Sequence, residues 1–198
     1  MAYQLQIAMT EQRAPGVEFS AGMATTVLLK WFNPYGPVPL VRADVPDVAE
    51  VMGRFVRIPD LIKIDGFWAF CPEVMTLIDR LEPGINQFFP VNLVRQRGSK
   101  PLYRQDGAPM TVPYYFLYVT QIIDAVDIER SDVLIRGPSL IRKPGHPFVF
   151  RKDLIAGHHI WIGNFHFGRA KICFSDERVS GIRQLGCKGF DAEHFDEV

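Results

Sequence analysis

The sequence predicts an α+β protein that consists mostly of antiparallel sheets with a few short helices. Three observations support this fold class. Hydrophobic residues make up 47% of the 198 residues, which is enough to bury a substantial core. The apolar runs are short and end at turn residues, and the chain contains 16 Gly and 15 Pro. The segments 70–89 and 174–190 share one strand–helix–strand pattern, which suggests two related halves.

The first forty residues are read as strands and loops. Residues 3–9 are predicted as an edge strand, and the mixed segment 10–26 is predicted as a loop. The apolar run 26–32 resembles a strand, and the turn residues of 33–39 end it. Three such strand-like runs carry the tryptophans, which are expected in the core or, if exposed, as interface anchors: Trp31, Trp68 and Trp161.

A short helix is predicted from Pro46, because a proline at the first helical position lacks only an N–H that would have no partner there. Four apolar side chains then recur at helical spacing and share one face: Val48, Val51, Met52 and Phe55. This segment is therefore expected to pack as an amphipathic helix.

A hairpin and a second helix follow. Two strands with the turn dipeptide Asp-Gly at 65–66 between them form the predicted hairpin: 61–64 and 67–70. Pro72 suits the first helical position, and Glu73 favours the positive end of the helix. The helix carries an apolar stripe and stops at the Pro-Gly pair 83–84, and a strand over 87–94 comes next.

The polar, turn-rich segment 95–113 is the candidate linker of the chain. The run 114–123 after it is aromatic and β-branched, which predicts the strongest strand of the protein. Four short strands are predicted beyond it: 132–136, 139–143, 147–151 and 158–162. We expect a single α+β domain over 1–198, whose sub-halves 1–94 and 114–198 are joined by loop 95–113.

The last unit begins with a strand at 171–174. Ser175 is a good N-cap for the helix that follows, and the acids Asp176 and Glu177 suit its first turn. Three apolar residues form the inner face of this helix: Val179, Ile182 and Leu185. The final strand is predicted over 190–195.

A constant offset of 104 residues aligns the two predicted helices and gives four identities in thirteen positions: Phe70 with Phe174, Glu73 with Glu177, Ile78 with Ile182, and Leu81 with Leu185. Leu77 aligns with Gly181. A glycine inside a helix costs about 1 kcal/mol relative to alanine, so Gly181 is expected to permit a close backbone approach. Two explanations stay open, namely duplication and the general physical similarity of strand–helix–strand units. Both place the helices against a sheet with no chemical role.

Composition and charge exclude several classes of function. The 22 Lys and Arg balance the 22 Asp and Glu, so the chain lacks a basic footprint for nucleic acid or for an anionic membrane. The three cysteines lack Cys-x-x-Cys spacing, which favours a reducing cytosol over a disulfide framework. The N-terminus has no signal-peptide pattern and no segment is apolar enough for a membrane span, so a cytoplasmic protein is expected.

No catalytic, cofactor-binding or metal-binding residues are predicted. Glycine-rich phosphate loops and the Gly-x-Ser-x-Gly elbow are absent. His158, His159 and His166 form a cluster, but adjacent strand residues point to opposite faces, and no nearby cysteine or carboxylate completes a ligand set. Cys71 precedes a helix whose dipole could lower its thiol pKa. A structural role is nevertheless the simpler interpretation for Cys71 and for Cys187, which also lies near a helix end.

Two charged clusters are candidates for binding a partner. The segment DAVDIERS at 124–131 follows a hydrophobic strand and supplies Asp124, Asp127, Glu129 and Arg130. Its carboxylates suit a cation or a basic partner, whereas the alternative is a turn whose Asp and Ser side chains bond local backbone amides. The 95–113 loop supplies Arg95, Arg97 and Arg104, with a solvated connection as the alternative.

Several stretches in this order resemble a known bacterial family: EPGINQFFPVNLV, YYFLYVTQIIDAVDIERS, and KDLIAGHHIWI leading to FSDERVSGIRQLGCKGF. The family was first catalogued as a domain of unknown function and later assigned to the immunity proteins of polymorphic toxin systems, as immunity family eleven. The resemblance covers roughly residues 45–195, and HHIWIGNFHF departs from the Ile-Phe-Arg-Leu type of strand expected before the last helix. It implies a cytosolic protein that binds a cognate toxin of the same cell by stoichiometric occlusion, without turnover or cofactors.

Two alternatives from other classes stay open at this point. One is an enzyme whose active site includes Asp124, Asp127 and a histidine, which a deep pocket with perturbed pKa values would support. The other is a structural or adaptor protein that self-associates through an exposed strand edge, for example as a homodimer.

Overall fold

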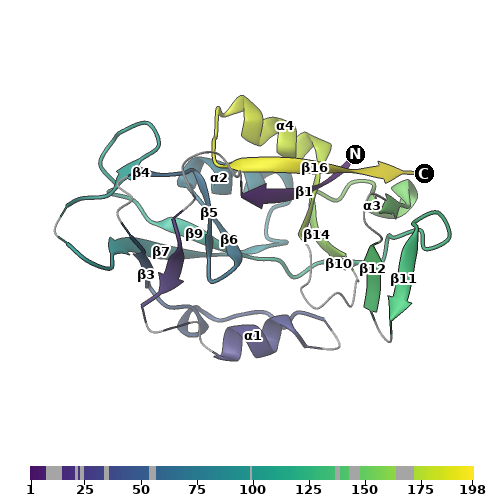
Figure 1. The fold of residues 1–198 in the computed structure, drawn as a ribbon, viewed down its shortest axis with the longest axis horizontal. Helices are drawn as coiled ribbons and strands as arrows, with labels where there is room; N and C mark the ends of the chain where they lie inside the picture. The colour runs from purple at the N-terminus through teal and green to yellow at the C-terminus, as the bar shows by residue number, and fades with distance from the viewer. Residues whose placement is uncertain are drawn as a thin grey trace.

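The computed structural model, drawn in Figure 1, confirms an α+β fold. It describes residues 1–7, 15–20, 22, 25–33, 36–53, 57–98, 100–136, 139–142, 148–163 and 172–198. Within these stretches the strands form a closed six-stranded barrel, a six-stranded mixed sheet and two separate strand pairs. Eight of the thirteen strand pairings are antiparallel. Among the described helices, none is long and apolar enough to cross a membrane.

The barrel consists of β2 (Val17–Phe19), β3 (Val48–Val51), β5 (Leu61–Ile64), β6 (Phe67–Phe70), β7 (Gln87–Arg95) and β9 (Tyr114–Tyr118). It closes in the order β2-β3-β7-β9-β6-β5. β5 and β6 form the predicted hairpin, because Asp65 and Gly66 both adopt positive φ angles, 48° and 90°, which suit the twist of a two-residue turn. Helix α2 (Pro72–Leu81) follows β6 and starts at the predicted proline.

The six-stranded sheet consists of β1 (Ala2–Ile7), β10 (Ile122–Ile123), β13 (Val149–Phe150), β14 (Ile160–Gly163), β15 (Ile172–Ser175) and β16 (Phe190–Glu197). Its order is β10-β14-β15-β1-β16-β13. Helix α4 (Asp176–Gln184) joins β15 to β16, and Ser175 caps it as predicted, since its side chain accepts a hydrogen bond from Arg178 N at 3.2 Å.

Shorter elements surround the barrel and the sheet. The two strand pairs join β4 (Arg57–Ile58) with β8 (Tyr103–Arg104) and β11 (Val133–Arg136) with β12 (Ser139–Arg142). The remaining helices are α1 (Thr25–Trp31), the 3-10 helix η1 (Arg42–Asp44) and α3 (Lys152–Ile155). The predicted linker 95–113 therefore contains strand β8, and its Leu102 side chain is buried.

The two similar sequence segments adopt the same topology. In both, a strand, a helix and a second strand enclose one inserted antiparallel strand: β9 lies between β6 and β7, and β1 lies between β15 and β16. The first strands also match in detail, because Phe70 pairs with Tyr115 and Phe174 pairs with Tyr3. The units are thus alike in structure, and duplication stays a hypothesis about their origin.

The predicted helix from Pro46 is wrong, because the segment forms strand β3 of the barrel. Ala49 and Val51 are buried while the two residues beside them are less so, which is the two-residue period of a strand. Neighbours on both sides, β2 and β7, satisfy its backbone. The helical spacing of its apolar residues was therefore overridden by barrel closure, and Phe55, the last of them, lies outside the described residues.

Two N-terminal predictions are also corrected. The strand-like run 26–32 forms helix α1, and the predicted loop before it contains β2. The predicted edge strand is the described β1, which pairs with β15 on one side and with β16 on the other and so lies inside its sheet. The side-by-side placement of β1 and β16, at opposite ends of the chain, is visible at the top of Figure 1.

The core has two parts. The larger hydrophobic cluster fills the barrel and continues to one face of the six-stranded sheet, where Tyr3, Leu5 and Phe174 join it. The smaller cluster lies on the opposite face and includes Trp161 and Cys173. All three tryptophans are buried, as expected. The predicted division into sub-halves stays a prediction, although β1 lies in the sheet with C-terminal strands and β9 lies in the barrel.

Candidate functional site

Helix α1 presents apolar side chains to solvent while an aromatic residue fixes it to the barrel. Trp31 packs edge-on against Phe67 and Tyr118, with ring centroids 5.0 and 5.2 Å apart. On the outer side of the helix and just beyond its end, Leu29 and Phe32 are 69% and 53% exposed. Exposed apolar residues that cluster on a fixed element are typical of protein interaction sites.

Polar contacts fasten the segment that follows α1. Lys30 Nζ pairs with Asp44 Oδ2 at 2.6 Å, and the same carboxylate oxygen accepts a hydrogen bond from Val41 N at 2.7 Å. These two contacts lower the pKa of Asp44, with the Lys30 hydrogen bond as the larger cause. Tyr118 OH donates to Val38 O at 3.0 Å. Helix α1 and the following segment thus keep a defined position on the barrel.

A groove of about 690 Å³ lies between α1, the β5–β6 hairpin and β1. The polar residues Gln4, Lys63 and Asp65 share its lining with aromatic and aliphatic side chains: Leu28, Trp31, Phe32, Phe67, Trp68 and Ile172. Lys63 Nζ lies 4.9 Å from the centroid of the Trp68 ring, which is a cation–π contact. The size and the lining of the groove suit the insertion of an apolar or aromatic side chain from a partner.

The apolar surface continues from α1 to the six-stranded sheet. Val38 and Val41 are exposed beside α1, and Ile122 is exposed on β10, the edge strand of that sheet. Ile122 Cδ1 lies 3.3 Å from the position that a Cβ on Gly36 would take, so the sheet edge packs against the segment after α1. We call these five exposed residues the α1 surface: Leu29, Phe32, Val38, Val41 and Ile122.

The predicted acidic cluster begins two residues after Ile122 and contains a local turn. Asp127 Oδ1 accepts a hydrogen bond from Arg130 N at 3.0 Å, and Asp127 Oδ2 pairs with Arg130 Nη1 at 3.1 Å. Ser131 is buried and exchanges hydrogen bonds with the backbone of Val149. These contacts are those of the turn interpretation. Asp124 and Glu129 are exposed, so their charges face solvent, and Asp124 lies two residues after Ile122 of the α1 surface.

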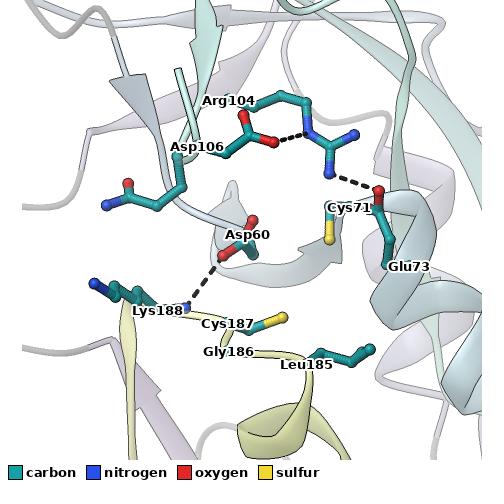
Figure 2. A pocket seen from close by; sticks show the side chains of 10 residues that line it. Asp60, Cys71, Glu73, Arg104, Asp106, Leu185, Gly186, Cys187 and Lys188 are labelled. Carbon is teal, nitrogen blue, oxygen red and sulfur yellow. Dashed lines mark hydrogen bonds and ion pairs between the residues drawn. The ribbon is translucent and has the colours of Figure 1, made fainter. Parts of the chain in front are cut away.

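The predicted basic residues lie elsewhere. Arg95 is half-buried at the end of β7, Arg97 is exposed, and Arg104 is on β8. Arg104 Nη2 bonds Glu73 Oε1 at 2.6 Å, and its Nε lies 4.0 Å from Asp106, as Figure 2 shows. The strand pair β4–β8 lies toward the opposite end of the long axis from β10 in Figure 1. Arg104 and the acidic cluster that follows β10 therefore lie in different parts of the molecule.

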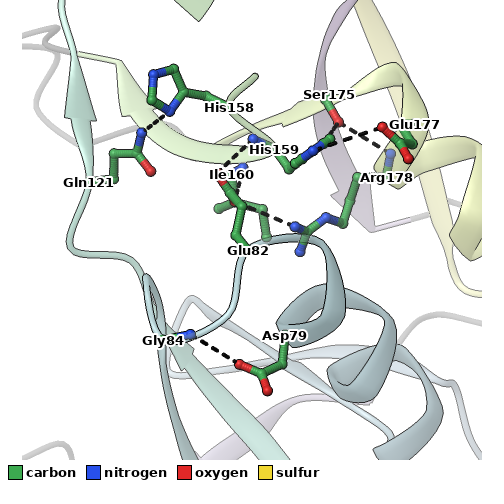
Figure 3. Close-up of polar contacts among 10 residues, drawn as sticks. All are labelled: Asp79, Glu82, Gly84, Gln121, His158, His159, Ile160, Ser175, Glu177 and Arg178. Atoms are coloured by element: carbon green, nitrogen blue, oxygen red, sulfur yellow. Dashed lines mark hydrogen bonds and ion pairs between the residues drawn. The ribbon is translucent and has the colours of Figure 1, made fainter. Parts of the chain in front are cut away.

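The two described histidines of the predicted cluster belong to a polar network that joins the barrel to the sheet (Figure 3). The carboxylate of Glu82, just after α2, accepts hydrogen bonds from His159 N and Ile160 N, both at 2.9 Å, and lies 3.4 Å from Arg178 Nη2. The His159 ring contacts Ser175 Oγ at 2.9 Å, and the His158 ring bonds the Gln121 side chain. This network explains both histidines as structural, and His166 lies outside the described residues.

Burial shapes the charges of this network. Arg178 is completely buried, and burial lowers its pKa to about 10, although Glu82 and Glu177 oppose the shift. The guanidinium thus remains charged at neutral pH. Within the part of the chain that the structure describes, no three His, Cys, Asp or Glu side chains come together to hold a metal ion. None of the three cysteines of the chain forms a disulfide.

The chain belongs to the Immunity protein family (Imm11), whose model matches residues 38–197. The match spans the barrel strands from β3 onward and most of the six-stranded sheet, and it confirms the resemblance found in the sequence. Members of this family are normally non-enzymatic toxin inhibitors, which supports a binding function over the enzymatic alternative. No curated protein matches the chain.

Sequence reasoning missed the α1 surface. The run 25–32 has apolar residues on every side, so its helical face could not be separated from a buried strand. The available signal was the four-residue spacing of Val27 and Trp31, the two residues of α1 that are buried. Helix α1 also lies before residue 38, outside the part of the chain that the family model matches.

Proposed function

We propose that this chain neutralises a cognate bacterial toxin by forming a stoichiometric complex that occludes the toxin's working surface, without turnover. The observation that carries the proposal is membership of the immunity protein family over residues 38–197. A toxin partner made by the same cell follows from such a function, and the cytoplasm of the producing cell is the compartment in which we propose that it acts. The three free thiols are compatible with a reducing compartment.

The α1 surface supports this proposal because it has the composition of an interface centre. Interfaces combine a few large apolar anchors with a polar rim, and a fixed scaffold loses little conformational entropy when it binds. Leu29 and Phe32 supply the anchors, and the groove beside them can receive a side chain of the toxin. Helix α1, which carries Leu29, lies outside the region that the family model matches, so it also offers a means to discriminate one toxin from another.

The acidic rim suggests the charge of the toxin's contact face. Asp124 and Glu129 are exposed, and Asp124 lies two residues after Ile122 of the α1 surface, so we propose that both face basic residues of the toxin and accelerate its association. Asp127 and Arg130 pair with each other, and we propose that they hold the turn that presents this rim. In the alternative, Arg95, Arg97 and Arg104 would contact the toxin instead. The variants described below distinguish this contact from binding through the α1 surface.

Co-expression with the product of the neighbouring toxin gene tests the function. The expected result is restored growth of the host cell and a complex of fixed stoichiometry by size exclusion with light scattering. The chain measured alone in the same instrument tests the homodimer alternative. Absence of both binding and growth rescue would contradict the proposed function.

Matched substitutions locate the interface. Leu29→Asp and Phe32→Ala are expected to weaken toxin binding at least tenfold, because the loss of a hot-spot anchor costs about 2 kcal/mol or more. Leu185→Asp is the control, since Leu185 is 49% exposed near helix α4, on the opposite side from α1 in Figure 1. Asp124→Lys should slow association, whereas Arg97→Glu should not. If Leu185→Asp or Arg97→Glu is the variant that abolishes binding, the interface lies away from α1.

A further inference from the structure

Two cysteines that are 116 positions apart in the sequence line one cavity of about 310 Å³. The cavity lies between the start of α2 and the turn after α4, and Figure 2 shows the sulfur atoms of Cys71 and Cys187 directed into it from opposite sides. The lining also contains five charged residues: Asp60, Glu73, Arg104, Asp106 and Lys188. The fold thus brings together thiols from the barrel side and from the sheet side of the molecule.

Asp60 holds both cysteine-bearing segments in place. Its backbone oxygen accepts a hydrogen bond from Cys71 N at 2.9 Å, and its carboxylate accepts one from Lys188 N at 3.2 Å. The carbonyl of Cys71 in turn accepts from Met75 N in the first turn of α2. Asp60 therefore fixes the backbone at Cys71 and next to Cys187. These two contacts hold the two thiols on facing sides of the same cavity.

The two thiols differ in access and in acidity. Cys71 is only 2% exposed, whereas Cys187 is half-buried and therefore the more accessible of the two thiols. The hydrogen bond between the thiols lowers the pKa of Cys187, although its burial and the charge of Asp60 oppose this, and the same hydrogen bond together with burial raises the pKa of Cys71. Cys187 is thus the thiol that is both reachable and more readily ionised.

We propose that Cys71 and Cys187 are an oxidation site at which a hydroperoxide forms an intramolecular disulfide. The Cys187 thiolate attacks one peroxide oxygen, so that an S–O bond forms, the O–O bond breaks and the leaving hydroxide takes up a proton. The Cys71 sulfur then gives up its proton and attacks the Cys187 sulfur, which expels hydroxide that this proton converts to water. The two sulfur atoms lose two electrons in total, and one hydrogen peroxide becomes two water molecules.

The disulfide would join Cys71, the residue immediately before α2, to Cys187 in the turn after α4. It would therefore close a long loop around the contact between the barrel and the sheet and restrict the unfolded chain. In a reducing cytosol the pair stays as thiols, and the disulfide forms only under oxidative challenge. This inference does not depend on the α1 surface, because the cavity lies beside the end of α4, on the opposite side of the molecule from helix α1 (Figure 1).

Hydrogen peroxide added to the reduced, folded chain is the test. Thiols counted after denaturation should fall from three to one, and peptide mapping without reductant should find one linkage, Cys71 to Cys187. A thiol reductant should restore all three thiols, and the oxidised chain should have the higher Tm. The matched control is Cys173→Ser, because Cys173 is buried in the other core cluster, and this variant should fall from two thiols to none.

Other products would overturn the proposal. They are a mixture of linkages that includes Cys173, a dimer linked through Cys187, or a Cys187 sulfinic acid beside a free Cys71 thiol. The wild-type map alone decides between these outcomes, so the proposal does not depend on whether a variant folds. Cys187→Ser should leave Cys71 as a free thiol under the same treatment, because Cys71 has little access to solvent.

Discussion

The carboxyl group of Asp60 lines the two-cysteine cavity, and its surroundings disfavour the ionised carboxylate. Burial raises its pKa, and the nearby acids Glu73 and Asp106 add to this, whereas the Lys188 N–H and Arg104 act in the opposite direction. A carboxyl whose folded-state pKa exceeds its unfolded value contributes stability that is complete below the unfolded pKa. That contribution is lost as the pH rises through the folded-state pKa.

Asp60→Asn should therefore raise the Tm of the reduced chain by a few degrees at pH 7, because Asn keeps an oxygen for Lys188 N and does not ionise. At pH 4, near the ordinary pKa of the carboxyl, the difference in Tm between variant and wild type should shrink. Thermal unfolding across pH 4–7 measures this. Asp106→Asn is the control, because Asp106 is mostly exposed, and it should show a much smaller pH-dependent difference. A difference for Asp60→Asn that does not change with pH would contradict the argument.

At the scale of elements, the contact between α2 and α4 explains why the second helix contains a glycine. A Cβ at position 181 would lie 2.9 Å from Leu77 Cδ2 and 3.2 Å from Leu77 Cδ1. The residue pair that the 104-residue offset aligns, Leu77 and Gly181, is thus in contact in the fold, with a large side chain on one helix and none on the other. The close approach expected from the sequence is confirmed.

A double-mutant cycle tests this complementarity. Leu77→Ala should destabilise the chain by about 2–5 kcal/mol, because it removes a largely buried side chain. In that background, Gly181→Ala should be more favourable by about 0.5–3 kcal/mol than in the wild type, since the clash is gone and the gain in helix propensity remains. Chemical denaturation measures the four free energies of unfolding. Glu177 is exposed on the same helix, so the effect of Glu177→Ala should add to that of Leu77→Ala. If the effects of Gly181→Ala and Leu77→Ala are also additive, the two residues are not coupled and the argument is contradicted.

The elements that sequence reasoning predicted correctly carry their own local signals. Pro72, Ser175 and the Asp-Gly pair at 65–66 each determine a start or a turn through backbone geometry that does not depend on distant residues. The errors have the opposite character. Strand β3 and helix α1 take their states from the barrel, which offers β3 two neighbours and holds α1 by Trp31. The residues within β3 and α1 do not by themselves indicate that these segments pack on a barrel.

The candidate site was predictable only in part for the same reason. The seven charged residues were visible as clusters, yet which of them share a surface depends on where β8 and β10 lie in the fold. The α1 surface and the two-cysteine cavity each combine residues that are far apart in the chain, such as Phe32 with Ile122 and Cys71 with Cys187. The family resemblance indicated the function, but it does not include helix α1.

At the scale of the whole molecule, the proposed interface depends on how the barrel meets the sheet, because α1 packs on the barrel and Ile122 belongs to the sheet. Glu82 is the polar connection between them. Its carboxylate takes two backbone N–H groups of the segment that enters β14 and faces the buried guanidinium of Arg178 on α4. Removing one partner of a buried ion pair leaves the other charge uncompensated, which is far costlier than the loss of an exposed charge.

Glu82→Gln should therefore destabilise the chain by about 3–5 kcal/mol, because Arg178 stays charged and buried. Asp79→Asn, an exposed carboxylate on the preceding helix, should change the free energy of unfolding by no more than about 0.5 kcal/mol. Adding Arg178→Met to Glu82→Gln should recover part of the loss, since it removes the uncompensated charge. Denaturant unfolding of the three variants checks this order. A double variant less stable than Glu82→Gln would show that the backbone contacts of Glu82, and not its charge, join the barrel to the sheet.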